Sequence, residues 1–399
     1  MRRATAVLGM VGALVLGVVA PAPAQEASGR SAASATSSPP DELGPYEVGR
    51  TTLTLKDTAR NDRTLPVDVW YPVDAEDAVD VPASEYDLLL ARLRSEVALA
   101  EPVLSDEGPF PLVVFSHGSG GVRYQSYFLT EVLASHGFVV AAPDHVGNTT
   151  IDLLLGTPAP FGQSARDRPK DVSFVIDELL ERSRTDDDPL AGAGDGDHIG
   201  VAGHSFGGYT DLAAATTSAA GPADPRVDAI VPISPASGPF SDEALAAIEV
   251  PMLVLGGTAD TTTPIDPSST RPYALAESRR RFRVDVDGAG HASFTNICDF
   301  YDTLAPVAPA NILEFLSALR DDGCGPDLVP IAEAQRLTNY YTVAFFQRFI
   351  GGELGYGRYL RPSSRRTDAE SDVTLFARGR DEGRRCASVA RGPRCERRR

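Results

Sequence analysis

The chain has 399 residues, of which 42% are hydrophobic and 23% are charged. These proportions exclude a disordered or fibrous protein, and the length is sufficient for one large α/β core. The formal net charge of −18 argues against nucleic acid as a partner.

The N-terminus has the three parts of a secretory signal peptide. A start with two arginines precedes an apolar stretch over residues 6–20, and residues 22–24 form an A-x-A-like cleavage site. We therefore expect residues 1–24 to be removed, Gln25 to begin the mature chain, and the protein to be secreted to the extracellular space or the cell envelope. An uncleaved anchor is the alternative, and both Sec and twin-arginine export remain open. No later segment predicts stable membrane insertion.

Four cysteines lie in the last quarter of the chain: Cys298, Cys324, Cys386 and Cys395. Export permits disulfides, and we expect the pairs Cys298–Cys324 and Cys386–Cys395. Four cysteines allow three connectivities, and the sequence alone does not choose among them. Their spacing is not that of metal ligands, so we expect no metal site.

Composition divides the rest of the chain. Residues 25–44 are rich in Ala, Ser and Pro and predict a disordered linker. Residues 45–355 are expected to form the catalytic domain, in which residues 84–107 form a helical insertion, because their leucines have helical spacing. Residues 356–399 form an arginine-rich tail, which we expect to be solvated and flexible.

Strands alternate with helices along the predicted domain. Strands are expected at 46–55, 64–72, 112–116, 138–142, 199–202, 228–234, 251–257 and 282–286, and helices at 124–136, 172–182 and 330–351. This alternation predicts an α/β fold with a doubly wound, mostly parallel sheet. The first two strands would form an antiparallel N-terminal edge, with Trp70 as a packing residue.

A glycine-flanked serine lies between a strand and a helix. Gly203, Ser205 and Gly207 form a G-x-S-x-G motif after the apolar run 199–202. A serine in such a tight turn needs small neighbours, and it lies at a helix N-terminus, where the N–H groups favour negative charge. The motif therefore predicts a nucleophile elbow.

A serine nucleophile needs a base, and one histidine is suitably placed. His291 follows the last strand of the domain, where the base is found when the order is Ser, acid, His. The other histidines precede the serine, and we expect His204 to pack inside the motif and His117 to brace its own loop. The remaining three lie in helices or loops: His136, His145 and His198.

The acid that orients the base should follow the preceding strand. Asp260 lies in the turn after the strand 251–257, where open α/β sheets collect functional groups. Asp266 is the competitor, but the prolines on either side of it indicate an outer loop. We expect Asp260 to be the third catalytic residue.

Two N–H donors are needed for the oxyanion. One is Phe206, the residue after the nucleophile, and the other comes from the loop that begins at His117. We assign the second donor to Ser119, with Gly120 as the alternative. Together these residues predict acyl transfer through a serine acyl-enzyme, without a metal or an organic cofactor.

Four segments resemble one superfamily: residues 115–121, 203–208, 257–260 and 290–291. In this order they are similar to the α/β-hydrolases, and in particular to the branch of platelet-activating-factor acetylhydrolases and dienelactone-hydrolase-like proteins. The resemblance covers about residues 45–320. The pairing of Phe-Ser-His-Gly with Gly-His-Ser-Phe-Gly-Gly is typical of that branch.

The resemblance implies a serine esterase that uses Ser205, Asp260 and His291, with Ser119 and Phe206 as oxyanion donors. Two departures limit it. Dienelactone hydrolases use cysteine where this chain has serine, so lactone opening is not carried over. Ser119 replaces the larger apolar residue common in the acetylhydrolases, so their acyl preference is not carried over.

We therefore expect a secreted carboxylic-ester hydrolase that acts on short-chain or lipid-like esters. A serine peptidase or amidase on the same fold is one alternative, and a non-catalytic binding protein that keeps the fold is another. The expected partner is a small ester, and the sequence is silent on the oligomeric state.

Overall fold

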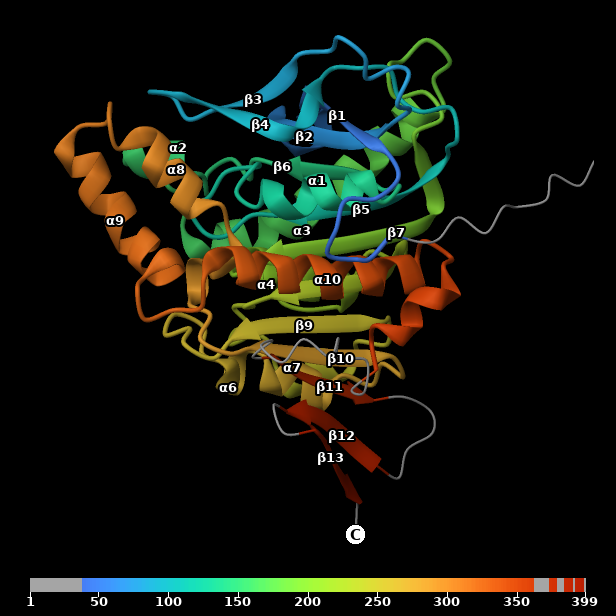
Figure 1. The fold of residues 1–399 in the computed structure, drawn as a ribbon, viewed down its shortest axis with the longest axis vertical. Helices are drawn as coiled ribbons and strands as arrows, with labels where there is room; N and C mark the ends of the chain where they lie inside the picture. The colour runs from blue at the N-terminus through green and yellow to red at the C-terminus, as the bar shows by residue number, and fades with distance from the viewer. Residues whose placement is uncertain (1–37, 362–372, 379–383, 390–391, 398–399) are drawn as a thin grey trace, which may run out of the picture. The chain divides into compact units, whose positions relative to one another are not determined.

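The computed structural model describes residues 38–361, 373–378, 384–389 and 392–397 (Figure 1). The predicted signal peptide and the first part of the predicted linker lie outside the described residues. In the described part of the chain, no helix is both long enough and apolar enough to span a bilayer.

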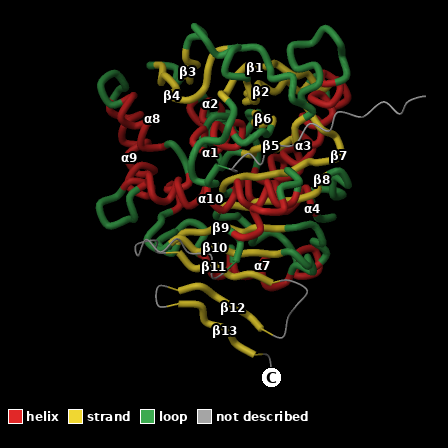
Figure 2. Tube along the Cα trace, turned by 45° about the vertical axis from the view of Figure 1, so that its right-hand side comes forward, coloured by secondary structure: helices red, strands yellow, loops and turns green. Residues whose placement is uncertain are grey.

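One mixed sheet organises the described chain, with the strand order β13-β12-β11-β10-β9-β8-β7-β5-β6-β2-β1-β4-β3 (Figures 1 and 2). Its strands are β1 (Glu47–Asp57), β2 (Arg63–Val73), β3 (Ala83–Asp87), β4 (Arg92–Ala100), β5 (Phe110–Ser116), β6 (Val139–Pro143), β7 (Gly194–His204), β8 (Val227–Ile233), β9 (Met252–Gly257), β10 (Arg281–Val286), β11 (Val373–Arg378), β12 (Arg384–Val389) and β13 (Gly392–Arg397).

The centre of the sheet is parallel and its edges are largely antiparallel. Strands β6, β5, β7, β8, β9 and β10 pair in parallel, whereas β2 pairs antiparallel with β6, and β11 with β10. The predicted α/β class is confirmed. The antiparallel N-terminal edge is also confirmed, and the structure adds a second antiparallel edge at the C-terminal end.

Helices cover both faces of this sheet (Figure 2). They are α1 (Tyr127–Ser135), α2 (Thr150–Leu154), α3 (Phe161–Ser183), α4 (Phe206–Ala215), α5 (Asp242–Ala246), α6 (Ile265–Ser268), α7 (Thr270–Leu275), α8 (Ile297–Leu304), α9 (Ala310–Cys324) and α10 (Ile331–Phe349), with short 3₁₀ turns η1 (Thr58–Arg60), η2 (His291–Phe294) and η3 (Leu354–Arg358).

The alternation of strand β5 shows why the sheet needs two layers of helices. Val113 and Phe115 enter the core shared with α1 and α10, whereas Leu112 and Val114 enter the core shared with α3 and α4. All four side chains are fully buried. A strand buried on both faces reads as a continuous apolar run, which is how this strand was predicted.

The predicted helical insertion over residues 84–107 is wrong, because β3 and β4 form an antiparallel hairpin there. The leucines that suggested a helix lie around the turn, where Leu89 has a positive φ of 68°. Buried and exposed residues alternate along β3, and Tyr86 donates a hydrogen bond to Glu131 Oε1 at 2.6 Å. Burial of every second residue on one face of the sheet decided the structure here, and the helical spacing of the leucines did not.

Some described residues of the predicted linker and tail are bonded to the domain. In the linker, Asp41 forms an ion pair with Arg336, and Gly44 N donates to Ser135 Oγ. The tail contributes β11 to β13, and Val373 is buried against the core. Backbone pairing with β10 supplies order that the charge of this segment does not suggest.

One of the two expected disulfides is confirmed. Cys298 at the start of α8 is bonded to Cys324 at the end of α9. Cys386 and Cys395 are directly opposite in the antiparallel register of β12 and β13. Their side chains lie outside the described part of the structure, so this pairing stays a prediction.

Candidate active site

Ser205 lies in a strained turn between β7 and α4. Its φ of 58° is in the left-handed region, which a non-glycine residue rarely adopts. The turn is held in place by backbone hydrogen bonds, because Ser205 N donates to Ile233 O at 2.8 Å. This is the strand–turn–helix geometry that the motif predicted, with the serine at the N-terminus of the helix.

The two glycines of the motif are required by close approach to β5. A Cβ atom on Gly207 would overlap the carbonyl oxygen of Ser116, and one on Gly203 would lie 2.7 Å from the same oxygen. Backbone atoms cannot move aside as a flexible side chain can. The turn therefore packs against the end of β5 only if both positions lack a side chain.

Asp260 and His291 are brought together from the ends of β9 and β10. Asp260 Oδ2 lies 2.8 Å from His291 Nδ1. The other oxygen, Oδ1, accepts hydrogen bonds from Thr262 N and Thr263 N, both at 2.8 Å. Because Nδ1 faces the carboxylate, Nε2 is the nitrogen left to exchange a proton with another group.

The Asp260 carboxylate is held in its charged form. Burial acts to raise its pKa, but the hydrogen bonds from His291 and Thr263 outweigh burial and hold the pKa of Asp260 well below its usual range. Asp266, the competing acid, is exposed and accepts a hydrogen bond from Thr270 Oγ1. It lies in the short helix α6 and not in the outer loop that the flanking prolines suggested.

His204 does more than fill space, which corrects the packing role expected for it. Gln125 Nε2 can only donate, so His204 Nδ1 accepts from it at 3.1 Å, and His204 Nε2 donates to His291 O at 2.9 Å. Burial lowers the pKa of His204 to about 3, so the ring is neutral, as this pattern requires. Gln125 Oε1 in turn accepts from Gly118 N at 2.9 Å, so one relay joins the His117 loop, the elbow and the His291 loop.

The peptides that carry the two expected oxyanion donors are fixed in the same way. Gly118 O, on the peptide that supplies Ser119 N–H, faces His117 Nδ1 at 2.7 Å and Gly121 N at 3.1 Å. Ser205 O, on the peptide that supplies Phe206 N–H, accepts from Tyr209 N and Ala236 N. In a trans peptide the N–H points away from the carbonyl, so both N–H directions are fixed.

The alternative donor is already engaged. Gly120 N donates to Asn148 O at 3.2 Å. Within the described residues, no protein acceptor faces Ser119 N, and Phe206 N belongs to the first turn of α4, where N–H groups have no partner in the helix. The geometry therefore favours Ser119 over Gly120.

One cavity of about 300 Å³ joins these groups. Ser119, Ser205 and His291 line it, at the carboxyl ends of β5, β7 and β10. The rest of its wall comes largely from apolar residues, many of them on α8 and α9: Val122, Ala292, Ile297, Phe300, Leu316 and Leu319. The disulfide between Cys298 and Cys324 ties these two helices together.

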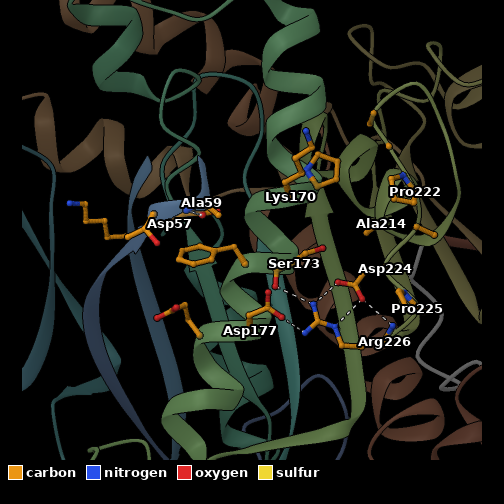
Figure 3. A pocket seen from close by; sticks show the side chains of 18 residues that line it. Asp57, Ala59, Lys170, Ser173, Asp177, Ala214, Pro222, Asp224, Pro225 and Arg226 are labelled. Atoms are coloured by element: carbon orange, nitrogen blue, oxygen red, sulfur yellow. Dashed lines mark hydrogen bonds and ion pairs between the residues drawn. The ribbon is translucent and has the colours of Figure 1, made fainter. Parts of the chain in front are cut away.

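A larger hollow of about 720 Å³ lies elsewhere, between the end of β1, helix α3 and the loop before β8 (Figure 3). It shares no lining residue with the first cavity. One of the cations that line it, Arg226, is paired with Asp224 at 2.7 Å and with Asp177 at 2.5 Å. Among the described residues, no group of three or more His, Cys, Asp or Glu is placed to hold a metal ion.

Sequence reasoning missed several residues of this site. Thr263 follows Asp260 by three positions, and an Asp–Thr pair at that spacing is typical of a side-chain-closed turn, so it could have been found. Gln125 and Asn148 had no such signal, because their partners are distant in the sequence.

The chain is similar to one protein family and to several known proteins. A family model described as PET hydrolase-like matches residues 108–307. The bis(hydroxyethyl) terephthalate hydrolase of Streptomyces coelicolor is 29% identical over 194 residues, which cover 48% of this chain and 54% of that protein. The chain thus aligns with about half the length of this relative.

Two longer matches extend the comparison. The platelet-activating factor acetylhydrolase of Cavia porcellus is 22% identical over 377 residues, which cover 80% of each chain. Among solved structures, the ferulic acid esterase from Streptomyces cinnamoneus has a TM-score of 0.62 and 26% identity, and the match covers 83% of this chain and 96% of that one. Ser119, Ser205, Phe206, Asp260 and His291 all lie inside the segment matched by the family model.

Proposed function

Because the chain belongs to the PET hydrolase-like family of the α/β-hydrolase superfamily, we propose that it is a serine carboxylic-ester hydrolase. One observation carries the proposal. A serine in a strained elbow and a histidine paired with a buried carboxylate line the same cavity. Strain of this kind persists where the surrounding structure enforces it, which is typical of active sites.

The proposed mechanism assigns one role to each group. His291 Nε2 takes the proton of Ser205 Oγ, which attacks the ester carbonyl, and the N–H groups of Ser119 and Phe206 stabilise the oxyanion. His291 then protonates the leaving alcohol and activates the water that hydrolyses the acyl-enzyme. Asp260 keeps the imidazole in the tautomer with Nε2 free and stabilises its protonated form.

The proposed substrates are short-chain or lipid-like esters. The apolar wall formed by α8 and α9 suits an acyl or aromatic group, and the cavity of about 300 Å³ is small for a long chain. Exposed apolar side chains on and near α2 add a second apolar surface: Ile151, Leu153, Leu154, Leu155 and Phe161. Leu153 lies directly beside Gly120 of the oxyanion loop.

A panel of esters tests this function. We expect the purified protein to hydrolyse p-nitrophenyl acetate and butyrate faster than the longer homologues. Methyl ferulate and bis(hydroxyethyl) terephthalate test the aromatic esters that the relatives' names suggest. Cleavage of an aminoacyl amide with all esters untouched would favour a peptidase. No turnover, together with no labelling of Ser205 by an organophosphate, would favour a non-catalytic protein.

We also propose that the enzyme is exported with its leader removed. The signal-peptide pattern of residues 1–24 and the disulfide between Cys298 and Cys324 support an oxidising destination. N-terminal sequencing of the protein collected outside the cytoplasm should begin at Gln25. A sequence beginning at Met1 would support the uncleaved anchor instead.

A further inference from the structure

Arg168, on helix α3, is a fully buried cation behind the oxyanion loop. The residue has no exposed surface, and its guanidinium donates to His117 O, to Ser116 Oγ at 3.1 Å and to Asn148 Oδ1 at 2.7 Å. Within the described residues, no carboxylate forms an ion pair with it. A buried charge that no ion pair compensates is costly, so the position of Arg168 calls for a reason.

The same guanidinium touches the segments that carry both proposed oxyanion donors. Its carbon lies 4.7 Å from the centre of the Phe206 ring, a distance suited to cation–π attraction. Asn148, held by Arg168, donates from Nδ2 to Ser119 Oγ at 3.2 Å, and its carbonyl accepts from Gly120 N. One side chain therefore bridges the elbow and the loop opposite it.

Two carboxylates, Asp171 and Asp211, act on the charge of Arg168 through coulombic attraction. The Asp171 carboxylate is already paired with Arg60 and Arg63. Burial lowers the pKa of Arg168 to about 9, which leaves it cationic at neutral pH. Asp211 is also fully buried, and neither of its carboxyl oxygens has a hydrogen-bond partner. Burial raises the pKa of Asp211 well above its usual range, which favours the neutral acid. A net positive charge therefore remains behind the loop, in a region that excludes water.

We propose that Arg168 is a positioning residue of the oxyanion hole, which fixes both donor segments from behind and adds a positive potential where the oxyanion forms. The inference rests on the proposed ester hydrolysis. Preorganised dipoles and charges act most strongly in such dry surroundings, because they need no rearrangement when charge develops. An arginine required only for folding would affect stability without discriminating between substrates.

Paired substrates separate these two roles. An oxoester and its thionoester differ in the atom that enters the oxyanion hole, and sulfur accepts hydrogen bonds weakly. For Arg168→Met, we expect kcat for the oxoester to fall about 10- to 100-fold, less than the loss of a whole donor, with KM changed little. The thionoester should lose much less, so that the ratio of the two rates falls about tenfold. Arg168→Lys keeps the charge without the planar fork and should lie between.

Arg50 offers a matched control. It is buried, hydrogen-bonded to Asp68 and placed over Tyr86 at 4.6 Å, but unlike Arg168 it contacts neither His117 nor Phe206. Arg50→Met should lower the thermal midpoint and leave the oxoester-to-thionoester ratio unchanged. If Arg168→Met does not fold, Asn148→Ala removes the link to Ser119 while the buried charge remains, and it should lower the ratio about threefold.

The outcomes are distinct. An unchanged ratio in every folded Arg168 variant, or an equal change in Arg50→Met, would overturn the inference. Rates are normalised to the fraction of Ser205 that an organophosphate labels, so loss of folded protein is not counted as loss of catalysis. If the wild-type protein hydrolyses no ester, the proposed function itself fails, which is a different result from an unchanged ratio.

Discussion

Two of the hollows in the described part of the molecule differ in chemical character, and the smaller of the two has the features of a reactive site. In the larger one, of about 720 Å³, Arg226 is paired with Asp224 and Asp177 (Figure 3). The smaller one, of about 300 Å³, contains a strained serine, and within the described residues no protein acceptor faces the N–H groups of Ser119 and Phe206. The volume of a hollow shows only that space is available. Hydrogen-bond donors without a protein partner show that a ligand can be bound there.

The difference between the two hollows can be tested by making the same type of substitution in each of them. Ser205→Ala should lower kcat/KM for p-nitrophenyl butyrate by at least ~10³-fold, because the nucleophile is lost. Ser173→Ala, the same change in the larger hollow, should leave kcat/KM within about twofold, since surface changes away from a site have small effects. Equal rates for Ser205→Ala and the wild type would refute the assignment.

A second pair of variants tests the carboxylates. Asp260→Asn should lower kcat, but the fold-loss should be about 10- to 100-fold smaller than the fold-loss for Ser205→Ala. The histidine loses its tautomer control in this variant, whereas the nucleophile remains. Asp177→Asn in the larger hollow should have no such effect. A fully active Asp260→Asn would direct attention to Asp266.

Asp260 also predicts a dependence of stability on pH. Its pKa is lowered in the folded state, so its contribution to the free energy of unfolding is present above the unfolded pKa of about 4 and is lost as the pH falls towards the folded value. The difference in unfolding free energy between wild type and Asp260→Asn should therefore be larger at pH 7 than at pH 3. Urea titrations at the two pH values measure it, and a difference that grows at pH 3 would contradict the sign.

A smaller effect is expected from the apolar wall. Leu319 lines the catalytic cavity and is 40% exposed, so its truncation should cost little stability. Leu319→Ala should change the ratio of butyrate to acetate turnover by up to about tenfold, as one or two methylenes do in an apolar pocket. Phe174→Ala, in the larger hollow, should leave that ratio unchanged even if the protein is less stable.

The smallest effect is expected at Arg226. Its side chain is 31% exposed, so its ion pairs with Asp224 and Asp177 are screened by solvent. Arg226→Ala should lower the free energy of unfolding by about 0–1 kcal/mol and leave ester turnover unchanged. A large loss of activity would mean that the larger hollow also serves the reaction.

Local features of the chain were readable from the sequence. The elbow was predictable because Gly203 and Gly207 meet Ser116 through backbone contacts that any side chain would block. The α/β-hydrolase superfamily expected from the motifs is confirmed by the family to which the chain belongs, and an acetylhydrolase is among its relatives. The order of Ser205, Asp260 and His291 along the chain predicted that their loops would meet at one edge of the sheet.

Features that depend on distant partners were not readable. The leucines near residue 89 had helical spacing, yet the pairing of β3 with β4 decided their conformation. Arg168 lies 37 residues before Ser205, and nothing in its neighbours signals that it contacts Phe206 and His117. Contacts of this kind depend on how α3 packs against β5 and α4, which local patterns do not encode.

Strand β11, in the C-terminal segment, covers an edge of the parallel part of the sheet. The charge of this segment did not suggest that role. The strand pairs with β10 over six residues, so the backbone groups of the last parallel strand are covered rather than open to another molecule. The sheet ends instead at β13, whose sequence Gly-Pro-Arg-Cys-Glu-Arg combines proline with charge. Both discourage strand addition at an open edge. A chain that ends at Arg361 should therefore be more prone to self-association, even with its active site intact.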